Sequence, residues 1–137
     1  MLFRSIWGGW FHDLTLTAEH MITFNALVHS LVERVSGTWS ARMLEVKQAS
    51  RASTVRDVSG TYRPGDNTIA PIMPAISVGE QSFDCTFDGV SCVIGPDCPA
   101  PVRALELSSS GLRFRGRLEH RGTGGIGEVW EIGRAHV

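Results

Sequence analysis

The sequence predicts an α+β fold that is mostly β, with antiparallel strands arranged as in a β-sandwich and one amphipathic helix at about 18–35. Apolar residues recur at helical spacing in that one segment. Segments in which apolar and polar residues alternate, as in half-buried strands, lie on both sides of it. The chain has 137 residues, 42% of them hydrophobic and 20% charged, which indicates one globular domain rather than a disordered chain.

The two ends of the chain are predicted to be translated sequencing adapter rather than protein. Residues 1–5 and 132–137 back-translate to the ends of two opposing short-read adapters, and such segments are excluded before the fold is considered. The twelve Arg against a single Lys indicate GC-rich coding DNA. We therefore expect 6–131 to be the genuine part, a partial β-rich domain. Its expected sections are a strand–helix–strand unit over 6–47, an irregular or extended section over 48–101, and a β-hairpin module over 102–131.

The first section predicts a strand, a helix and a second strand. Alternation through Trp10, Leu14 and Leu16 predicts a strand over 7–16. Thr17 is placed to cap a helix over 18–35, and Gly37 is placed to end it. The helix would bury one apolar stripe, formed by Met21, Phe24, Leu27, Val28, Leu31, Val32 and Val35. A strand follows over 38–46, with a shift in its alternation that indicates a bulge or an edge.

The later sections predict loops and then a hairpin. Residues 48–80 are rich in turn-forming residues, and Pro71 and Pro74 exclude 69–76 from a central strand. Residues 82–90 fit a short hairpin or another loop. Strands are expected over 102–107 and 112–119 and from 127 onward, with a turn at 108–111 and a glycine loop at 121–127. No internal repeat is found in the sequence.

The motifs that could carry chemistry are weak. Residues 122–127 match G-x-G-x-x-G, but a strand pattern rather than a helix follows, so a turn is the preferred interpretation. Cys85, Cys92 and Cys98 are too few for a four-ligand zinc site, and both one disulfide and free buried thiols remain open. His20 and His29 would lie on opposite faces of the predicted helix. We therefore predict no catalytic residue, no cofactor-binding residue, no metal ligand and no cofactor, and we expect no enzyme activity.

A stripe of basic residues marks the predicted strand 112–119. The side chains of Arg113, Arg115 and Arg117 would line one face about 7 Å apart, with Arg121 beyond them, and Phe114 would point the other way. Such a stripe suits phosphates or the carboxylates of a partner, although a solvated outer face is preferred. The net charge of −1 and the absence of a run of about 18 apolar residues favour neither nucleic acid nor membrane as a partner. The tryptophans and Phe114 are expected in the core or at a subunit interface.

The order of these elements resembles a known family. A strand at Gly8-Gly9-Trp10 leads into the helix pattern Phe24-x-x-Leu27-x-x-x-Leu31-x-x-x-Val35, and a strand at 36–39 follows at once. An irregular region with Pro74 comes next, then a strand at 103–107 and a closing segment at 130–132. In this order the chain resembles the distal-tail or minor-tail structural proteins of long-tailed bacteriophages.

The resemblance implies a structural component of the phage tail, here a truncated fragment. The implied partners are other tail proteins and further copies of the chain in a ring-type homo-oligomer. The implied location is the virion tail, and the host cytoplasm during assembly. Two alternatives remain open: a small ligand-binding barrel of the lipocalin or avidin kind, indicated by Gly37-Thr38-Trp39 and Gly60-Thr61-Tyr62, and a spurious translation with no function.

Overall fold

The chain is wound into a parallel β-solenoid. The computed structural model describes residues 2–48, 50–63, 75–79, 82–94, 105–107, 112–120 and 125–135. These residues form nine strands and no helix. The strands are β1 (Leu2–Trp7), β2 (Trp10–Val28), β3 (Leu31–Val46), β4 (Thr54–Tyr62), β5 (Ile76–Val78), β6 (Thr86–Ile94), β7 (Leu105–Leu107), β8 (Leu112–His120) and β9 (Gly125–Ala135).

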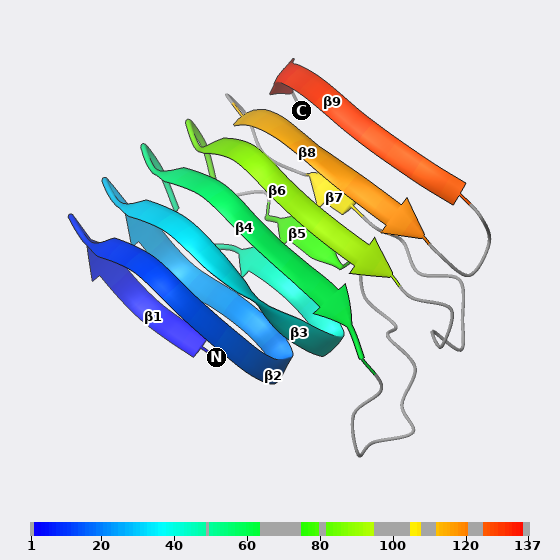
Figure 1. The fold of residues 1–137 in the computed structure, drawn as a ribbon. Helices are drawn as coiled ribbons and strands as arrows, with labels where there is room; N and C mark the ends of the chain where they lie inside the picture. Colours follow the sequence, from blue (N-terminus) through cyan, green and yellow to red (C-terminus); the bar gives the residue numbers. More distant parts are fainter. Residues whose placement is uncertain are drawn as a thin grey trace.

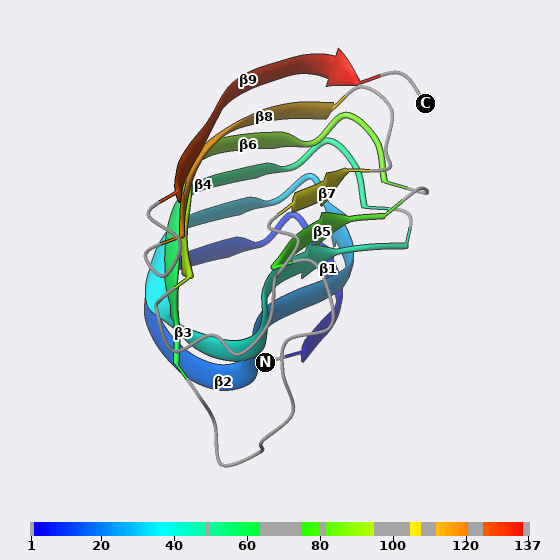
Figure 2. The same cartoon turned by 90° about the vertical axis from the view of Figure 1, so that its right-hand side faces the viewer.

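Two faces of strands enclose the interior of the solenoid. The strand order is β1-β2-β3-β4-β6-β8-β9, and β5 joins β3 to β7. All of these pairs are parallel except β8 with β9. The long strands β2 and β3 pass round a bend, so that they begin beside β4, β6 and β8 and end on the face that carries β1, β5 and β7 (Figures 1 and 2).

Equivalent residues of successive coils stack in register. Phe11 pairs with Val32, Val32 with Val55, Val55 with Phe87, and Phe87 with Phe114. These five residues are unevenly spaced along the chain, so the coils differ in length although their stacked segments match. Because parallel strands stack about 4.8 Å apart, each coil buries its apolar side chains against those of its neighbours.

The interior is a continuous apolar column. Phe24, Trp39, Phe87 and Phe114 are the largest of its fully buried side chains. The Phe87 and Phe114 ring centroids lie 5.8 Å apart, and in the previous coils Trp39 meets Tyr62 edge-to-face at 5.3 Å. This packing of one coil on the next supplies the hydrophobic stabilisation that no coil has alone.

A left-handed residue recurs at the same position of four coils. Asp13, Arg34, Asp57 and Gly89 have φ values of 55°, 53°, 52° and 68°. Each one separates two side chains that face the interior and are three positions apart, such as Val32 and Val35. A second left-handed position, at a corner, recurs at Gly8, His29, Ala52 and Asp84.

The predicted helix over 18–35 is wrong, and the left-handed residues His29 and Arg34 explain the helical spacing in its second half. Most of its expected apolar stripe is indeed buried, but on β2 and β3 rather than on a helix. His29 lies at the corner between β2 and β3, and Arg34 interrupts the alternation inside β3. The buried Val28, Val32 and Val35 therefore recur at spacings of four and three. That spacing is the signature of an amphipathic helix as well. Gly37, the predicted helix stop, lies inside β3.

The antiparallel sandwich is wrong too, whereas the β-rich character is confirmed. The section 48–101, expected to be irregular or extended, holds the strands β4, β5 and β6, each in the parallel stack. The strand predicted at 112–119 is confirmed as β8, and its hairpin with β9 is the one antiparallel pair among the described strands. Gly37-Thr38-Trp39 and Gly60-Thr61-Tyr62, taken as a sign of a lipocalin-like barrel, are instead stacked segments of adjacent coils.

The sequence does contain a repeat, contrary to the prediction. Val-x-x-Val-Ser-Gly-Thr-aromatic occurs at 32–39 and again at 55–62, and the two copies pair along their length. A looser copy, Phe-x-x-Val-Ser-Cys, lies at 87–92 in the next coil.

Within the described ranges no helix has the length and apolar character needed to cross a membrane.

Candidate functional site

A column of charged side chains runs along the outside of the solenoid. It contains one residue from each of five coils, in register, namely His12, Glu33, Arg56, Asp88 and Arg115. From Glu33 onward the charges alternate in sign. Opposite charges on neighbouring strands attract, so each charged side chain of the column can form an ion pair with its neighbour in the next coil.

In the first half of the charged column, from His12 to Arg56, Glu33 and Arg56 form such an ion pair. Glu33, only 4% exposed, accepts hydrogen bonds from Arg56 Nε (2.7 Å) and Trp10 Nε1 (3.1 Å). Arg56 Nη2 and Arg34 Nη1 lie 2.6 Å and 2.9 Å from its carboxylate oxygens. The hydrogen bond from Arg56, helped by the one from Trp10, holds the pKa of Glu33 below its usual value.

Beside the charged column, Asp13 is paired in the same way. Arg34 donates to it through Nε (2.7 Å) and Nη2 (3.0 Å), and His12 Nδ1 lies 2.6 Å away. These contacts hold the pKa of the Asp13 carboxyl well below its usual range, with the Arg34 hydrogen bond as the main cause. The pKa of Arg34 is raised for the same reason.

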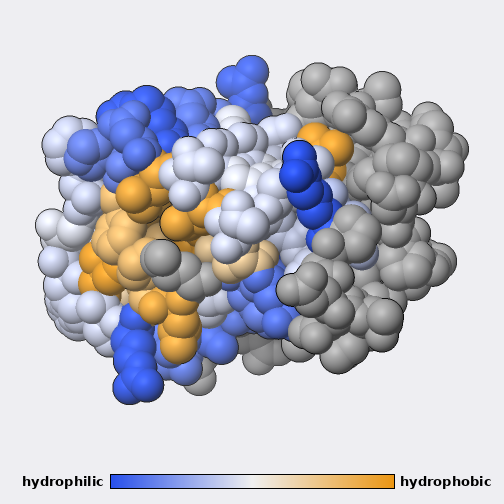
Figure 3. Space-filling view, turned by 60° about the horizontal axis from the view of Figure 1, so that its bottom comes forward, coloured by the Kyte–Doolittle hydropathy of each residue, from blue (hydrophilic) through white to orange (hydrophobic). Residues whose placement is uncertain are grey.

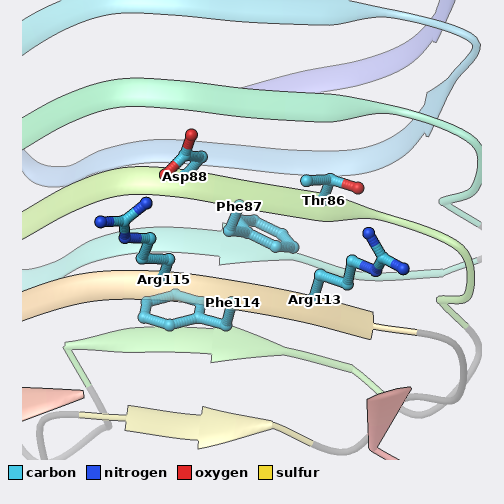
Figure 4. Close-up of a pocket in the computed structure, with 6 residues that line it drawn as sticks. All are labelled: Thr86, Phe87, Asp88, Arg113, Phe114 and Arg115. Carbon is cyan, nitrogen blue, oxygen red and sulfur yellow. The ribbon is translucent and has the colours of Figure 1, made fainter. Parts of the chain in front are cut away.

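The second half of the charged column opens into a small hollow between β6 and β8. The hollow has a volume of about 190 Å³ and is lined by Thr86, Phe87, Asp88, Arg113, Phe114 and Arg115 (Figure 4). The register places Arg113 opposite Thr86 and Arg115 opposite Asp88. Arg113 and Arg115 are exposed, while Phe114 between them and its partner Phe87 on β6 are buried. The polar groups are thus mounted on a rigid apolar layer.

The two arginines of this hollow have no side-chain partner in the part of the chain that the structure describes. Within the described residues, no ion pair or hydrogen bond joins the guanidinium of Arg113 or Arg115 to another side chain. Asp88 and Arg115 face each other in register, yet they do not close to ion-pair distance as Glu33 and Arg56 do. The hollow therefore offers two cationic donors, a carboxylate and a hydroxyl to a ligand.

The predicted arginine stripe is confirmed in part. Arg113 and Arg115 are exposed and Phe114 is buried between them, as the alternation predicted. Arg117 lies in β8 with its side chain outside the described part of the chain, and Arg121 lies outside it altogether. The sequence did not indicate Thr86 or Asp88 as their neighbours, because the stacking of the coils brings these residues together.

The other candidate residues do not line the hollow. Cys85 and Cys92 are buried free thiols, and Cys98 lies outside the described residues. Burial raises the pKa of Cys85 to about 11 and that of Cys92 to about 12, so neither forms a thiolate readily. His20 lies in β2 and His29 at an exposed corner. Residues 122–124 of the glycine motif are outside the described residues, and Gly125 and Gly127 belong to β9.

The comparisons with known proteins give no family for the chain. Protein-family models, curated proteins and solved structures all show no match. Among the described residues, no three His, Cys, Asp or Glu side chains gather in a group able to hold a metal ion. Because no known protein matches, function is inferred from the structure itself, that is, from the stacked coils and the hollow between β6 and β8.

Proposed function

We propose that the protein is a structural component that works by assembly, the role expected for it in a bacteriophage tail. The observation that carries this proposal is the end of the solenoid that β1 and residues 10–18 of β2 form in the given sequence, which we call the uncovered end. Residues 2–5 of β1 belong to the stretch predicted to be translated adapter, so residues 6–18 carry the argument. Within the described strands, β1 pairs only with β2, and residues 10–18 pair only with β3. Among the described strands of the given sequence, both segments therefore present an open strand edge. The setting in a phage tail rests on the sequence resemblance alone.

The side chains at this uncovered end favour a protein partner. Trp7 is 66% exposed and Trp10 is 58% exposed, while Phe3, Ile6, Phe11, Leu14 and Leu16 are partly buried against the core. Hydrophobic residues gather on the side of the molecule where β1 and β2 lie (Figure 3). An exposed apolar strand edge is a template for pairing with another chain, and large exposed aromatic residues anchor such interfaces.

The occupant that we propose for the uncovered end is a second copy of the chain. An open edge is able to extend the sheet of an identical neighbour, as the coils extend one another within the solenoid. Trp10 is already held rigid, because it stacks on His12 at 3.8 Å and donates to Glu33. A side chain fixed in this way loses little entropy when a partner covers it. The ring-type oligomer expected from the resemblance remains a prediction.

Sedimentation velocity on the purified chain tests this proposal. We expect association that grows with concentration between about 5 and 200 μM. Trp7→Lys places a charge on the uncovered end and should weaken association at least about ten-fold. The matched control is Phe83→Lys, because Phe83 is also exposed (40%) and lies in the same corner column, three coils further on. A wild-type chain that stays monomeric, or equal effects of the two variants, would overturn the proposal.

A further inference from the structure

We propose that the hollow between β6 and β8 binds an acidic sugar, with Arg113 and Arg115 holding its carboxylate and Asp88 and Thr86 meeting its hydroxyl groups. This site lies on the lateral face, several coils away from the uncovered end, and it does not depend on assembly. The inference follows from the contrast between the two halves of the charged column.

That contrast shows uncommitted positive charge. Arg56 and Arg34 are both engaged by carboxylates, at 2.6 to 3.0 Å. Arg113 and Arg115, on the same face, have no such partner among the described residues. Alternate residues of one strand lie about 7 Å apart, so the two guanidinium groups flank the hollow from one strand. Arginine forks bind carboxylates through paired hydrogen bonds, which makes an anionic group the natural ligand here.

The other two polar groups select a ligand with hydroxyls. The carboxylate of Asp88 offers only hydrogen-bond acceptors, and the Thr86 hydroxyl both donates and accepts. Figure 4 shows Asp88 beside Arg115 and Thr86 beside Arg113, along the same stretch of β6 and β8. A sugar acid supplies a carboxylate for the arginines and hydroxyl donors for Asp88. A phosphodiester has no donor to offer Asp88 and would be repelled by it, so nucleic acid fits the site less well.

The size of the hollow points to one ring of a longer chain. A volume of about 190 Å³ is below the roughly 300 Å³ at which pockets begin to enclose drug-sized ligands. The backbone beneath the hollow is held from inside by the buried pair Phe87 and Phe114, and the backbone amide of Arg113 donates to the Cys85 carbonyl at 3.1 Å. The backbone of the site is thus preformed, and the side chains of Arg113 and Arg115 are the parts that must be ordered on binding.

Titration of the full chain with a mannuronate tetrasaccharide, in about 0.15 M NaCl, tests the proposal by calorimetry and NMR. We expect Arg113→Gln and Arg115→Gln each to weaken binding about ten-fold, as for loss of a hydrogen bond to a charged group. The matched control is Arg63→Gln, an exposed arginine just after β4, which should change the affinity by less than about two-fold. Thermal unfolding of each variant, expected to match wild type, establishes that the fold is kept.

Two further arms separate a sugar site from simple attraction between charges. Asp88→Ala removes a negative charge and would tighten binding driven by charge alone, whereas loss of a hydroxyl acceptor should weaken it about three- to ten-fold. Cellotetraose, which has hydroxyls but no carboxylates, should not compete. The oligonucleotide (dT)5 carries as many negative charges as the tetrasaccharide and should bind at least about ten-fold more weakly. Equal binding of (dT)5, tighter binding by Asp88→Ala, or arginine variants no weaker than Arg63→Gln would overturn the proposal.

Discussion

Arg34 and Asp13 occupy the same left-handed position in two successive coils and are joined by a two-point ion pair. Nε and Nη2 of Arg34 lie 2.7 and 3.0 Å from the two carboxylate oxygens of Asp13. Their φ values, 53° and 55°, are nearly equal, so the backbone bends both coils alike and brings the two side chains together. The bend thus shapes the interior and also sets the pairs of the outer face.

The bend predicts a stability difference between two positions of β4. Asp57 has a φ of 52°, and a β-branched residue there meets its own backbone, so Asp57→Val should lower the free energy of unfolding by about 1–2 kcal/mol. Ser59, an exposed residue of the same strand, should accept valine at little cost, since valine suits extended backbone. Urea unfolding followed by circular dichroism measures both. Equal stabilities of the two variants would show that the left-handed position carries no constraint.

The ion pairs of Glu33 predict how stability depends on pH. Its pKa in the folded protein lies below the ordinary 4.5, so its contribution is fully present above about pH 4.5 and is lost as the pH falls through the folded pKa. We expect Glu33→Gln to lower the Tm at pH 7 and to approach the wild-type Tm at low pH. Glu19→Gln, at an exposed position of β2, serves as the control and should follow the wild-type curve. A Tm difference for Glu33→Gln that persisted at pH 2 would contradict this account.

The sequence predicted the composition of the core better than its geometry. Met21, Phe24, Leu27 and Val32 were identified as one buried set, and they are buried. From Val28 to Val35, this spacing could not distinguish a helix from strands interrupted by left-handed residues, because both place inward side chains three and four positions apart. Met21, Phe24 and Leu27 have no left-handed residue between them, so their helical spacing is not explained in this way. Only comparison between coils resolves this ambiguity, since the spacing of Val32 and Val35 returns in the next coil, at the positions that pair with them in β4.

The sequence predicted the arginines of the candidate site but not the residues that face them. Alternation along one strand was enough to place Arg113 and Arg115 on the outside. Their partners Thr86 and Asp88 depend on the register between β6 and β8, which shifts at an irregularity near Gly89. Because the coils also differ in length, no fixed period along the sequence reveals such neighbours.

The close approach of two coils predicts that Gly37 tolerates no side chain. A Cβ at this position would meet the backbone carbonyl of Leu16 in the preceding coil. Because backbone cannot move aside as a flexible side chain can, Gly37→Ala should cost about 3 kcal/mol, at the upper end for overpacking. Gly79→Ala is the control, since its Cβ would make ordinary contacts of 3.4 Å and more with Lys47. Denaturant midpoints measure the stability of both variants. A Gly37→Ala protein as stable as Gly79→Ala would refute the close approach of Gly37 to the Leu16 carbonyl.

The buried thiols of Cys85 and Cys92 predict a chain that resists thiol reagents while folded. Desolvation by burial raises the pKa of both groups, to about 11 and about 12, and the thiolate is the reactive form. In a Cys98→Ser background, DTNB at about pH 8 should label neither thiol rapidly in the native protein and both after denaturation. Labelling should therefore follow global opening of the stack, because both thiols lie between coils that must separate to expose them. Rapid native labelling of either thiol would show that its coil is open to solvent, and would contradict the stacked interior at β6.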